Sequence, residues 1–219
     1  MILIPVKDQS NAKERLAKLL VPAERRALAQ AMLQDVLDAV ITAASPAAIS
    51  LVTNDAYAEE LAEKLGIGVL DDGDAASETE AIERATDLCV KRGESWTLVI
   101  PGDAPLVTSE EVVRIFKSAP EKGSVLVTDH KRKGSNAVYR SPGNLFPLKF
   151  GDYSYAPHLR AAQQTGLPVQ QLMLPGIALD VDRPEDAGLV MSSPGETRTQ
   201  RLLRAWRIDI RLRKMAAAT

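Results

Sequence analysis

Short apolar runs alternate with helical periodicity along most of the chain. From Pro22 onward, apolar side chains recur at the i, i+3, i+4 spacing of one buried helix face, at Ala29, Leu33, Val36, Leu37, Val40 and Ile41. Similar patterns predict helices at residues 56–65, 79–91 and 109–118. Continuous apolar runs predict strands at residues 2–6, 49–53, 67–70, 96–100 and 124–128. Because apolar strands alternate with helices, the pattern predicts an α/β fold with a mostly parallel central sheet and helices on both faces.

The alternation becomes less regular after Asp129. We expect a strand at 136–139, a functional loop at 143–154, a helix at 155–165, a strand at 169–174 and a helix from about Arg183. Residues 207–213 alternate with period two, as an edge strand does, after a helix that contains Leu202, Leu203 and Trp206. The sequence therefore predicts one domain over residues 1–194 and a tail over 195–219 that packs on the body or on a second copy.

Composition narrows the class of protein. No apolar run approaches the roughly 20 residues that span a bilayer, and the first seven residues are too short for a secretory signal. The single cysteine, Cys89, cannot form an internal disulfide, which favours a reducing compartment and a buried structural thiol. We therefore expect a cytoplasmic protein without a membrane partner.

Charge is distributed unevenly along the chain. Residues 195–219 carry seven basic and two acidic side chains, whereas the whole chain has a net charge of −2. A basic tail can contact nucleic acid, but the body has no basic stripe with interleaved aromatics, and aromatic residues are only 4% of the chain. We expect no nucleic-acid partner and interpret the tail as a solvated or dimer-contacting appendage.

The first loop of the chain offers cations directly after a predicted strand. In a doubly wound sheet, ligands bind beyond the carboxyl ends of the strands, near a switch in strand order. Lys7, Lys13 and Arg15 follow the strand at residues 2–6, as a phosphate site requires. The loop contains neither a Walker A sequence nor a GxGxxG, so a solvated basic loop fits the residues equally well.

Two other strand ends carry acids. Asp103 follows the strand at 96–100, and the next helix has its own capping box in Thr108 and Glu111, so Asp103 is free for another role. Asp180 and Asp182 are two residues apart on an extended segment and face the same way. Asp182 can also act as a helix N-cap with Glu185, whereas Asp180 has no such role. Oxygen ligands without histidine or cysteine indicate Mg²⁺ or Mn²⁺ rather than zinc.

Two later loops combine small and polar residues that suit a small anion. They are Gly134–Ser135–Asn136 and Gly151–Asp152–Tyr153–Ser154, although ordinary surface loops have the same composition. His130 and His158 are isolated and read as surface or packing residues. The sequence has no G-x-S-x-G nucleophile elbow and no zinc-ligand spacing. It therefore gives no sign of a covalent nucleophile.

Taken together, these segments resemble the 2-phospho-L-lactate guanylyltransferase family. The resemblance rests on "PVKDQSNAKERL", "LLVPAERRALAQAML", "PGDAPLV", "GSNAV", "FGDYSYAPHL" and "LDVDRPED", in this order, over about residues 1–190. It implies a Rossmann-like nucleotidyltransferase fold of the kind found in sugar-nucleotide synthases. It also implies transfer of GMP from GTP to a phosphorylated three-carbon acid, with release of pyrophosphate, in the biosynthesis of a deazaflavin coenzyme.

The resemblance also implies roles for individual residues. Lys7, Lys13 and Arg15 would be the catalytic cations on the triphosphate, and Asp103, Asp180 and Asp182 would hold Mg²⁺ or Mn²⁺. The nucleotide would lie against Pro5, Val6, Lys7, Lys13, Ser77, Glu78 and Pro101. The acceptor acid would lie against Asn136, Gly151 and Ser154. Residues 72–80 depart from the Gly-Leu-Asn segment of many relatives, and Ser77 with Glu80 also forms a helix capping box.

The acceptor phosphate is already an anion, so such a transfer requires positioning and charge neutralisation rather than a general base. Phosphoenolpyruvate, 2-phospholactate and 3-phosphoglycerate are the candidate acceptors. Two alternatives stay open: a relative that uses another nucleotide or a sugar phosphate, and a nucleotide-binding protein without turnover. We further expect a homodimer and transfer of the product directly to the next enzyme.

Overall fold

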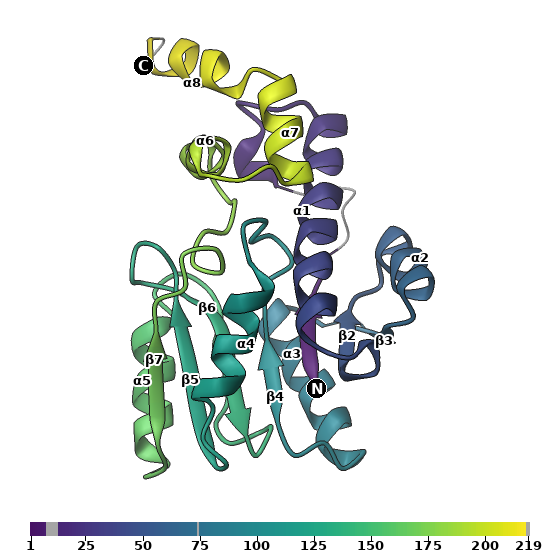
Figure 1. Ribbon diagram of the computed structural model, residues 1–219, viewed down its shortest axis with the longest axis vertical. Helices are drawn as coiled ribbons and strands as arrows, with labels where there is room; N and C mark the ends of the chain where they lie inside the picture. The colour runs from purple at the N-terminus through teal and green to yellow at the C-terminus, as the bar shows by residue number, and fades with distance from the viewer. Residues whose placement is uncertain (8–12, 74, 218–219) are drawn as a thin grey trace.

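A seven-stranded sheet of order β3-β2-β1-β4-β6-β5-β7 forms the centre of the computed structural model, which describes residues 1–7, 13–73 and 75–217 (Figure 1). The strands are β1 (Ile2–Pro5), β2 (Ile49–Val52), β3 (Gly68–Leu70), β4 (Thr97–Val99), β5 (Gly123–Thr128), β6 (Ser135–Ser141) and β7 (Val169–Leu172). Only β6 runs antiparallel to its neighbours, β4 and β5. The predicted mostly parallel sheet is confirmed.

Helices cover both faces of this sheet, as the sequence predicts. The helices on the sheet are α1 (Pro22–Ala43), α2 (Ala56–Leu65), α3 (Glu78–Lys91), α4 (Ser109–Ser118) and α5 (Tyr155–Gln164). Helices α6 (Pro184–Ser192), α7 (Arg198–Ala205) and α8 (Ile208–Ala217) follow them in the chain. Successive side chains of β1 point to opposite faces. Ile2 and Ile4 join the core under α1, α2 and α4, and Leu3 joins the core under α3 and α5.

A third apolar cluster lies beyond the sheet, where α6, α7 and α8 pack beside the first half of α1 (Figure 1). Its buried members include Leu16, Leu28, Val190, Leu203 and Ile208. Residues 195–217 therefore pack on the body of the same chain. Two 3-10 turns, Glu14–Leu16 and Pro46–Ala48, complete the described elements.

The predicted edge strand at residues 207–213 is wrong, because this segment lies largely in α8. Ile208 is buried in the third cluster, and Leu212 and Met215 pack against that cluster. These three residues have the i, i+4, i+7 spacing of one helix face. Ile208, Ile210 and Leu212 alone match a strand period, so the pattern over seven residues was ambiguous.

Ion pairs to the body explain part of the basic character of the tail. Arg198 pairs with Asp35 and Asp38 of α1. Arg211 of α8 donates to both carboxylate oxygens of Glu24, at 2.7 and 2.8 Å, and to the carbonyl oxygen of Leu19 at 3.2 Å. No helix of the described chain is both long and apolar enough to cross a membrane.

The Arg211–Glu24 pair should contribute about 1 kcal/mol to the free energy of unfolding, since bidentate geometry strengthens it while exposure of Arg211 weakens it. Arg211→Met should lose this contribution at pH 7. The hydrogen bonds from Arg211 lower the pKa of Glu24, so the pair stabilises the fold above the ordinary glutamate range and this stability is lost as the pH falls through it. Urea unfolding of both proteins at pH 7 and pH 3.5 measures the difference. An equal difference at both values would contradict the assignment.

Candidate active site

The sheet has a topological switch between β1 and β4, which are neighbours although β2 and β3 lie between them in sequence. Because β5 and β7 run in the same direction as β1 and β4, the segments after all four strands meet at one edge of the sheet. A cavity of about 1190 Å³ lies at this edge. Every residue that the sequence singled out for nucleotide, metal or acceptor binding lines it. The residues that the sequence singled out therefore gather around one cavity at this edge.

Three acids reach this cavity from two distant parts of the chain. Asp103 follows β4, whereas Asp180 and Asp182 lie in the segment that leads from β7 to α6. The backbone N–H of Val181 donates to the carbonyl oxygen of Asp103 at 3.0 Å. This bond fixes the two acidic segments side by side.

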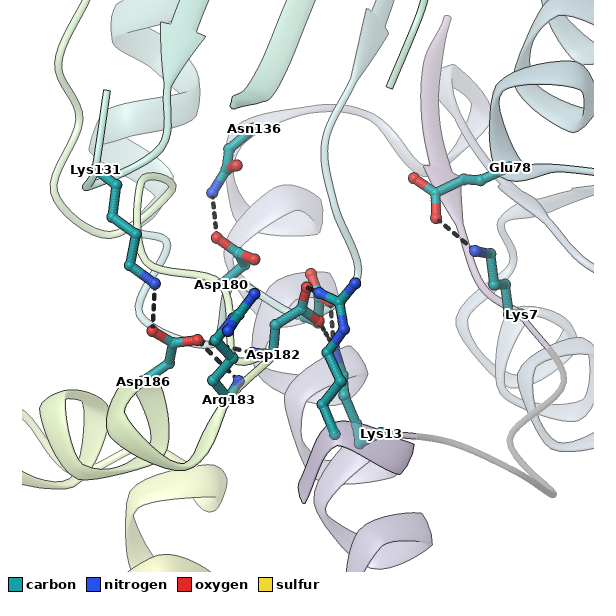
Figure 2. A network of polar contacts seen from close by, with 11 residues as sticks. Lys7, Lys13, Glu78, Lys131, Asn136, Asp180, Asp182, Arg183 and Asp186 are labelled. Atoms are coloured by element: carbon teal, nitrogen blue, oxygen red, sulfur yellow. Dashed lines mark hydrogen bonds and ion pairs between the residues drawn. The ribbon is translucent and has the colours of Figure 1, made fainter. Parts of the chain in front are cut away.

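Lys13 lies between two of these acids (Figure 2). Its Nζ is 2.5 Å from Oδ2 of Asp103 and 3.0 Å from Oδ1 of Asp182, and its side chain is only 13% exposed. Burial alone would lower the pKa of Lys13, but the charges of Asp103 and Asp182 outweigh burial and raise it. Lys13 is therefore held as an ammonium ion at this position.

The prediction that Asp182 is the N-cap of the following helix is wrong. Its carboxylate is therefore available to the site. Helix α6 begins at Pro184, and Asp186 accepts hydrogen bonds from the backbone N–H groups of Asp182 and Arg183, at 3.2 and 2.8 Å. Asp182 itself pairs with Lys13 and, at 3.4 Å, with Arg15. Although burial acts to raise the pKa of Asp182, the charge of Lys13 and the neighbouring cations lower it.

Asp180 is held differently from the other two acids. Asn136 donates from Nδ2 to Oδ1 of Asp180 at 2.9 Å and to the carbonyl oxygen of Ile177 at 2.8 Å (Figure 2). Burial, with the negative charges of Asp103 and Asp182, raises the pKa of Asp180 to about 6. In this structure Asn136, expected to contact the acceptor, orients an acid.

The described residues contain no group of three or more histidine, cysteine, aspartate or glutamate side chains arranged to hold a metal ion. The donor chemistry of the three acids still fits a hard divalent cation, because carboxylate oxygens are its preferred ligands. The effect of Asp103 and Asp182 on the pKa of Asp180 shows that their charges act on one another. In this structure the ammonium of Lys13 neutralises Asp103 and Asp182.

The nucleotide side of the cavity lies at the start of α3. The side chain of Ser77 accepts from the backbone N–H of Glu80, which confirms the predicted helix cap. Lys7 pairs with Glu78 at 3.5 Å and is 71% exposed. Burial raises the pKa of Glu78, an effect that the charge of Lys7 opposes. Lys7 is thus an exposed cation at the mouth of the cavity.

The acceptor loops are joined by buried hydrogen bonds. Ser154 accepts at its hydroxyl from the backbone N–H of Ser135 at 2.9 Å. His158, which is 1% exposed, accepts at Nε2 from the backbone N–H of Lys149 at 2.8 Å and meets the Ser135 hydroxyl through Nδ1 at 2.9 Å. Neutral His158 therefore carries its proton on Nδ1 and donates to Ser135. It is a packing residue, as expected, and it fixes the two loops.

Protonation of His158 should destabilise the protein at acidic pH. Burial, with a smaller effect from Arg140, lowers the pKa of His158 from 6.5 to about 4. Stability from the neutral ring is thus complete above pH 6.5 and is lost as the pH falls toward 4, by about 3 kcal/mol. The measurement is the free energy of unfolding between pH 7.5 and 4 for the wild type and His158→Gln. Parallel curves for the two proteins would show that His158 makes no such contribution.

Sequence reasoning missed several residues of the cavity. Lys131 donates to Asp186 at 3.3 Å, and Lys133 lies over the ring of Tyr153, 5.2 Å from its centroid. His130 also lines the cavity. These residues follow the carboxyl end of β5, so the rule that selected Lys7 and Asp103 applies equally to them. The polar residues at positions 129–133, just after the predicted strand at 124–128, could therefore have been predicted as part of the site.

The fold is shared with known structures of one class. The crystal structure of a protein described as a nucleotide-diphospho-sugar transferase from Desulfovibrio desulfuricans G20 superposes with a TM-score of 0.78 and 19% sequence identity, covering 97% of this chain and 96% of that chain. At this identity the likeness shows the fold alone. The expected nucleotide-diphospho-sugar transferase-like fold is confirmed.

Comparison with known sequences identifies the family of the chain. The family model described as "Guanylyl transferase CofC like" matches residues 1–219, and the chain belongs to this family. A phosphoenolpyruvate guanylyltransferase from Sphaerobacter thermophilus is 35% identical, covering 84% of this chain and 88% of that protein. A 2-phospho-L-lactate guanylyltransferase from Methanothermobacter thermautotrophicus is 29% identical, covering 95% and 92%. The expected family is confirmed, and the match includes the tail.

Proposed function

We propose that the protein transfers GMP from GTP to the phosphate of a phosphorylated three-carbon acid and releases pyrophosphate. The observation that carries the proposal is the convergence of Asp103 and Asp182 on Lys13, beside Asp180, at the switch point of a nucleotidyltransferase fold. The names of the relatives support the choice of reaction. Membership of a guanylyl transferase family supports GTP as the donor.

Two adjoining regions of the cavity are proposed for the two substrates. The region at the start of α3, with Ser77, Glu78 and Lys7, is proposed for the nucleotide. Asn136, Gly151 and Ser154 are proposed for the acceptor, and the backbone N–H of Phe150, next to Gly151, donates to the Thr79 hydroxyl of α3 at 3.0 Å. The three acids line the same cavity, so the two phosphates would meet beside these carboxylates.

The residues of the site suit a transfer that positions substrates and neutralises charge. Lys7, Lys13 and Arg15 would bind the triphosphate and neutralise the charge that develops on the leaving pyrophosphate. The phosphate of the acceptor attacks as an anion, so none of the described residues is required as a general base. Asp103, Asp180 and Asp182 would hold Mg²⁺ or Mn²⁺, which supplies Lewis-acid polarisation of the phosphates when bound.

We propose phosphoenolpyruvate or 2-phospho-L-lactate as the acceptor, in keeping with the relatives named for these acids. The two differ by a double bond, and 3-phosphoglycerate differs by a free hydroxyl on C2 and a phosphate on C3. Such differences are worth about 1–3 kcal/mol in a pocket, so one competition assay can rank them.

A mass-spectrometric assay tests the function directly. The protein receives GTP, Mg²⁺ and all three acids together, and we expect the mass of one GMP–acid adduct with an equimolar amount of pyrophosphate. Product only with another nucleotide or a sugar phosphate would favour the related transferase. Tight GTP binding without pyrophosphate release for any acceptor would favour a non-catalytic binding protein.

The remaining expectations stay predictions: a homodimer, a cytoplasmic location, a domain boundary near residue 194 and direct transfer of the product to the next enzyme. The packing of residues 195–217 on α1 and α6 supports a tail that is part of the folded body. Light scattering of the purified chain measures the oligomeric state.

A further inference from the structure

The ammonium of Lys13 occupies the space where two acids of the site face each other. Nζ contacts an oxygen of Asp103 at 2.5 Å and an oxygen of Asp182 at 3.0 Å, and these acids come from segments far apart in the chain. Lys13 itself has a left-handed backbone conformation, with φ of 53° and ψ of 46°, at the start of the 3-10 turn Glu14–Leu16. Non-glycine residues rarely adopt this conformation. With this backbone conformation, the Lys13 side chain points toward Asp103 and Asp182.

A divalent cation placed between Asp103 and Asp182 would compete with the Lys13 ammonium for these oxygens. Mg²⁺ lies about 2.0–2.1 Å from its oxygen ligands, so an ion between Asp103 and Asp182 would stand against Nζ, where two positive charges repel strongly. The carboxylates therefore have two alternative partners. In this structure the lysine is the partner of both acids, and Arg15 also pairs with Asp182 at 3.4 Å.

A triphosphate provides the second partner for Lys13. Lys13 and Lys7 line the same cavity, and Lys7 lies outside the acid cluster, paired with Glu78. The long flexible stem of a lysine allows its ammonium to change partner while the backbone stays in place. Phosphate oxygens at the nucleotide side of the cavity would offer Lys13 new acceptors as it leaves the acids.

We propose that Lys13 acts as a resident substitute for the divalent cation, so that the acids accept a metal ion strongly only when a nucleotide triphosphate takes Lys13 away. The proposal rests on the proposed function in one respect, the assignment of Asp103, Asp180 and Asp182 as metal-holding acids. It adds an order of events: metal and nucleotide bind together, and each raises the affinity for the other.

Binding of Mn²⁺ alone, followed by electron paramagnetic resonance without nucleotide, tests the proposal. Lys13→Gln should bind Mn²⁺ at least about 10-fold more tightly than the wild type, because a repelling positive charge is removed. Lys13→Arg keeps the charge and should bind as weakly as the wild type. Lys64→Gln is the control, since Lys64 is exposed on α2 outside the cavity and pairs with Glu60, and its Mn²⁺ affinity should equal that of the wild type. Equal or weaker Mn²⁺ binding by Lys13→Gln would overturn the proposal.

A double variant separates this proposal from the metal assignment. Lys13→Gln with Asp103→Asn should lose the tight Mn²⁺ binding of Lys13→Gln. If it does not, the acids do not hold the metal and that part of the proposed function fails. If Asp103→Asn weakens Mn²⁺ binding in both backgrounds while Lys13→Gln alone has no effect, the metal assignment stands and the substitution by lysine is refuted.

A measurement on the wild type does not depend on the folding of any variant. Acylation of Lys13 by an amine-reactive reagent, quantified by peptide mass spectrometry, should increase as Mn²⁺ is added without nucleotide, because metal and ammonium compete for the same oxygens. Acylation of Lys64, exposed on α2, should not change. A Lys13 acylation rate independent of Mn²⁺, up to saturation of the site, would contradict the competition.

Discussion

Replacing Asp103 by asparagine should lower kcat for pyrophosphate release from GTP by about 10²-fold or more, as is typical for loss of one electrostatic group at a reacting phosphate or carbonyl. The change keeps the size of the side chain and removes the charge that pairs with Lys13. It also removes one of the three carboxylates proposed to hold the metal. The measurement is steady-state pyrophosphate release with saturating GTP, Mg²⁺ and acceptor.

The control is Asp87→Asn, an acid exposed on α3 outside the cavity, which should turn over at the wild-type rate. Asp180→Asn should behave like Asp103→Asn, because both carboxylates face the same cavity. Wild-type kcat for either site variant in the presence of Mg²⁺ would show that the acids do not take part in the reaction.

Replacing Arg140 by methionine should lower the free energy of unfolding by about 3 kcal/mol, because it removes the hydrogen bonds of a fully buried guanidinium and leaves the carbonyl oxygen of Phe146 and the half-buried Glu83 without this donor. The Arg140 side chain is fully buried and donates to Glu83, to the hydroxyl of Thr86 and to the carbonyl oxygen of Phe146. Glu83 in turn accepts from the backbone N–H of Leu148 at 2.8 Å. Arg140 therefore joins β6, α3 and the segment that leads to the acceptor loop.

Urea unfolding of Arg140→Met against Arg160→Met measures this contribution. Arg160 is exposed on α5, and its replacement should change the free energy of unfolding by less than about 0.5 kcal/mol. Unfolding midpoints that agree between the wild type and Arg140→Met would contradict the structural role of the buried guanidinium.

The order of helices and strands was predictable because their periodicity is strong. The capping box of Thr108 was also readable, and the structure confirms that Thr108 accepts from the backbone N–H of Glu111, which leaves Asp103 to the site. The direction of β6 was not readable, since a fully buried strand has the same apolar pattern whether it runs parallel or antiparallel. Its first residues still reach the site edge because the antiparallel strand starts there.

The helix cap at the start of α6 was predicted incorrectly because two neighbouring acids can each accept the capping hydrogen bond. Glu185 and Asp186 are both acids near the start of α6, and the cap uses Asp186, so the predicted box was one residue out of register. Such a shift changes which acid is available, because Asp182 is freed to meet Lys13 and Arg15.

The contact between Lys13 and the acids had no local signal in the sequence. Lys13 is separated by 90 residues from Asp103 and by 169 from Asp182, and a lysine in a loop has many possible partners. The sequence predicted that cations and acids gather at one edge of the sheet. Only the three-dimensional structure shows that one cation lies between two acids.

Anomalous diffraction from Mn²⁺ in crystals grown with a non-hydrolysable GTP analogue shows which residues hold the metal. We expect a Mn²⁺ peak within coordination distance of carboxylate oxygens of Asp103 and Asp180 or Asp182, with the Lys13 ammonium on the phosphates. A Mn²⁺ ion held by the triphosphate alone, with Lys13 still between Asp103 and Asp182, would contradict this expectation.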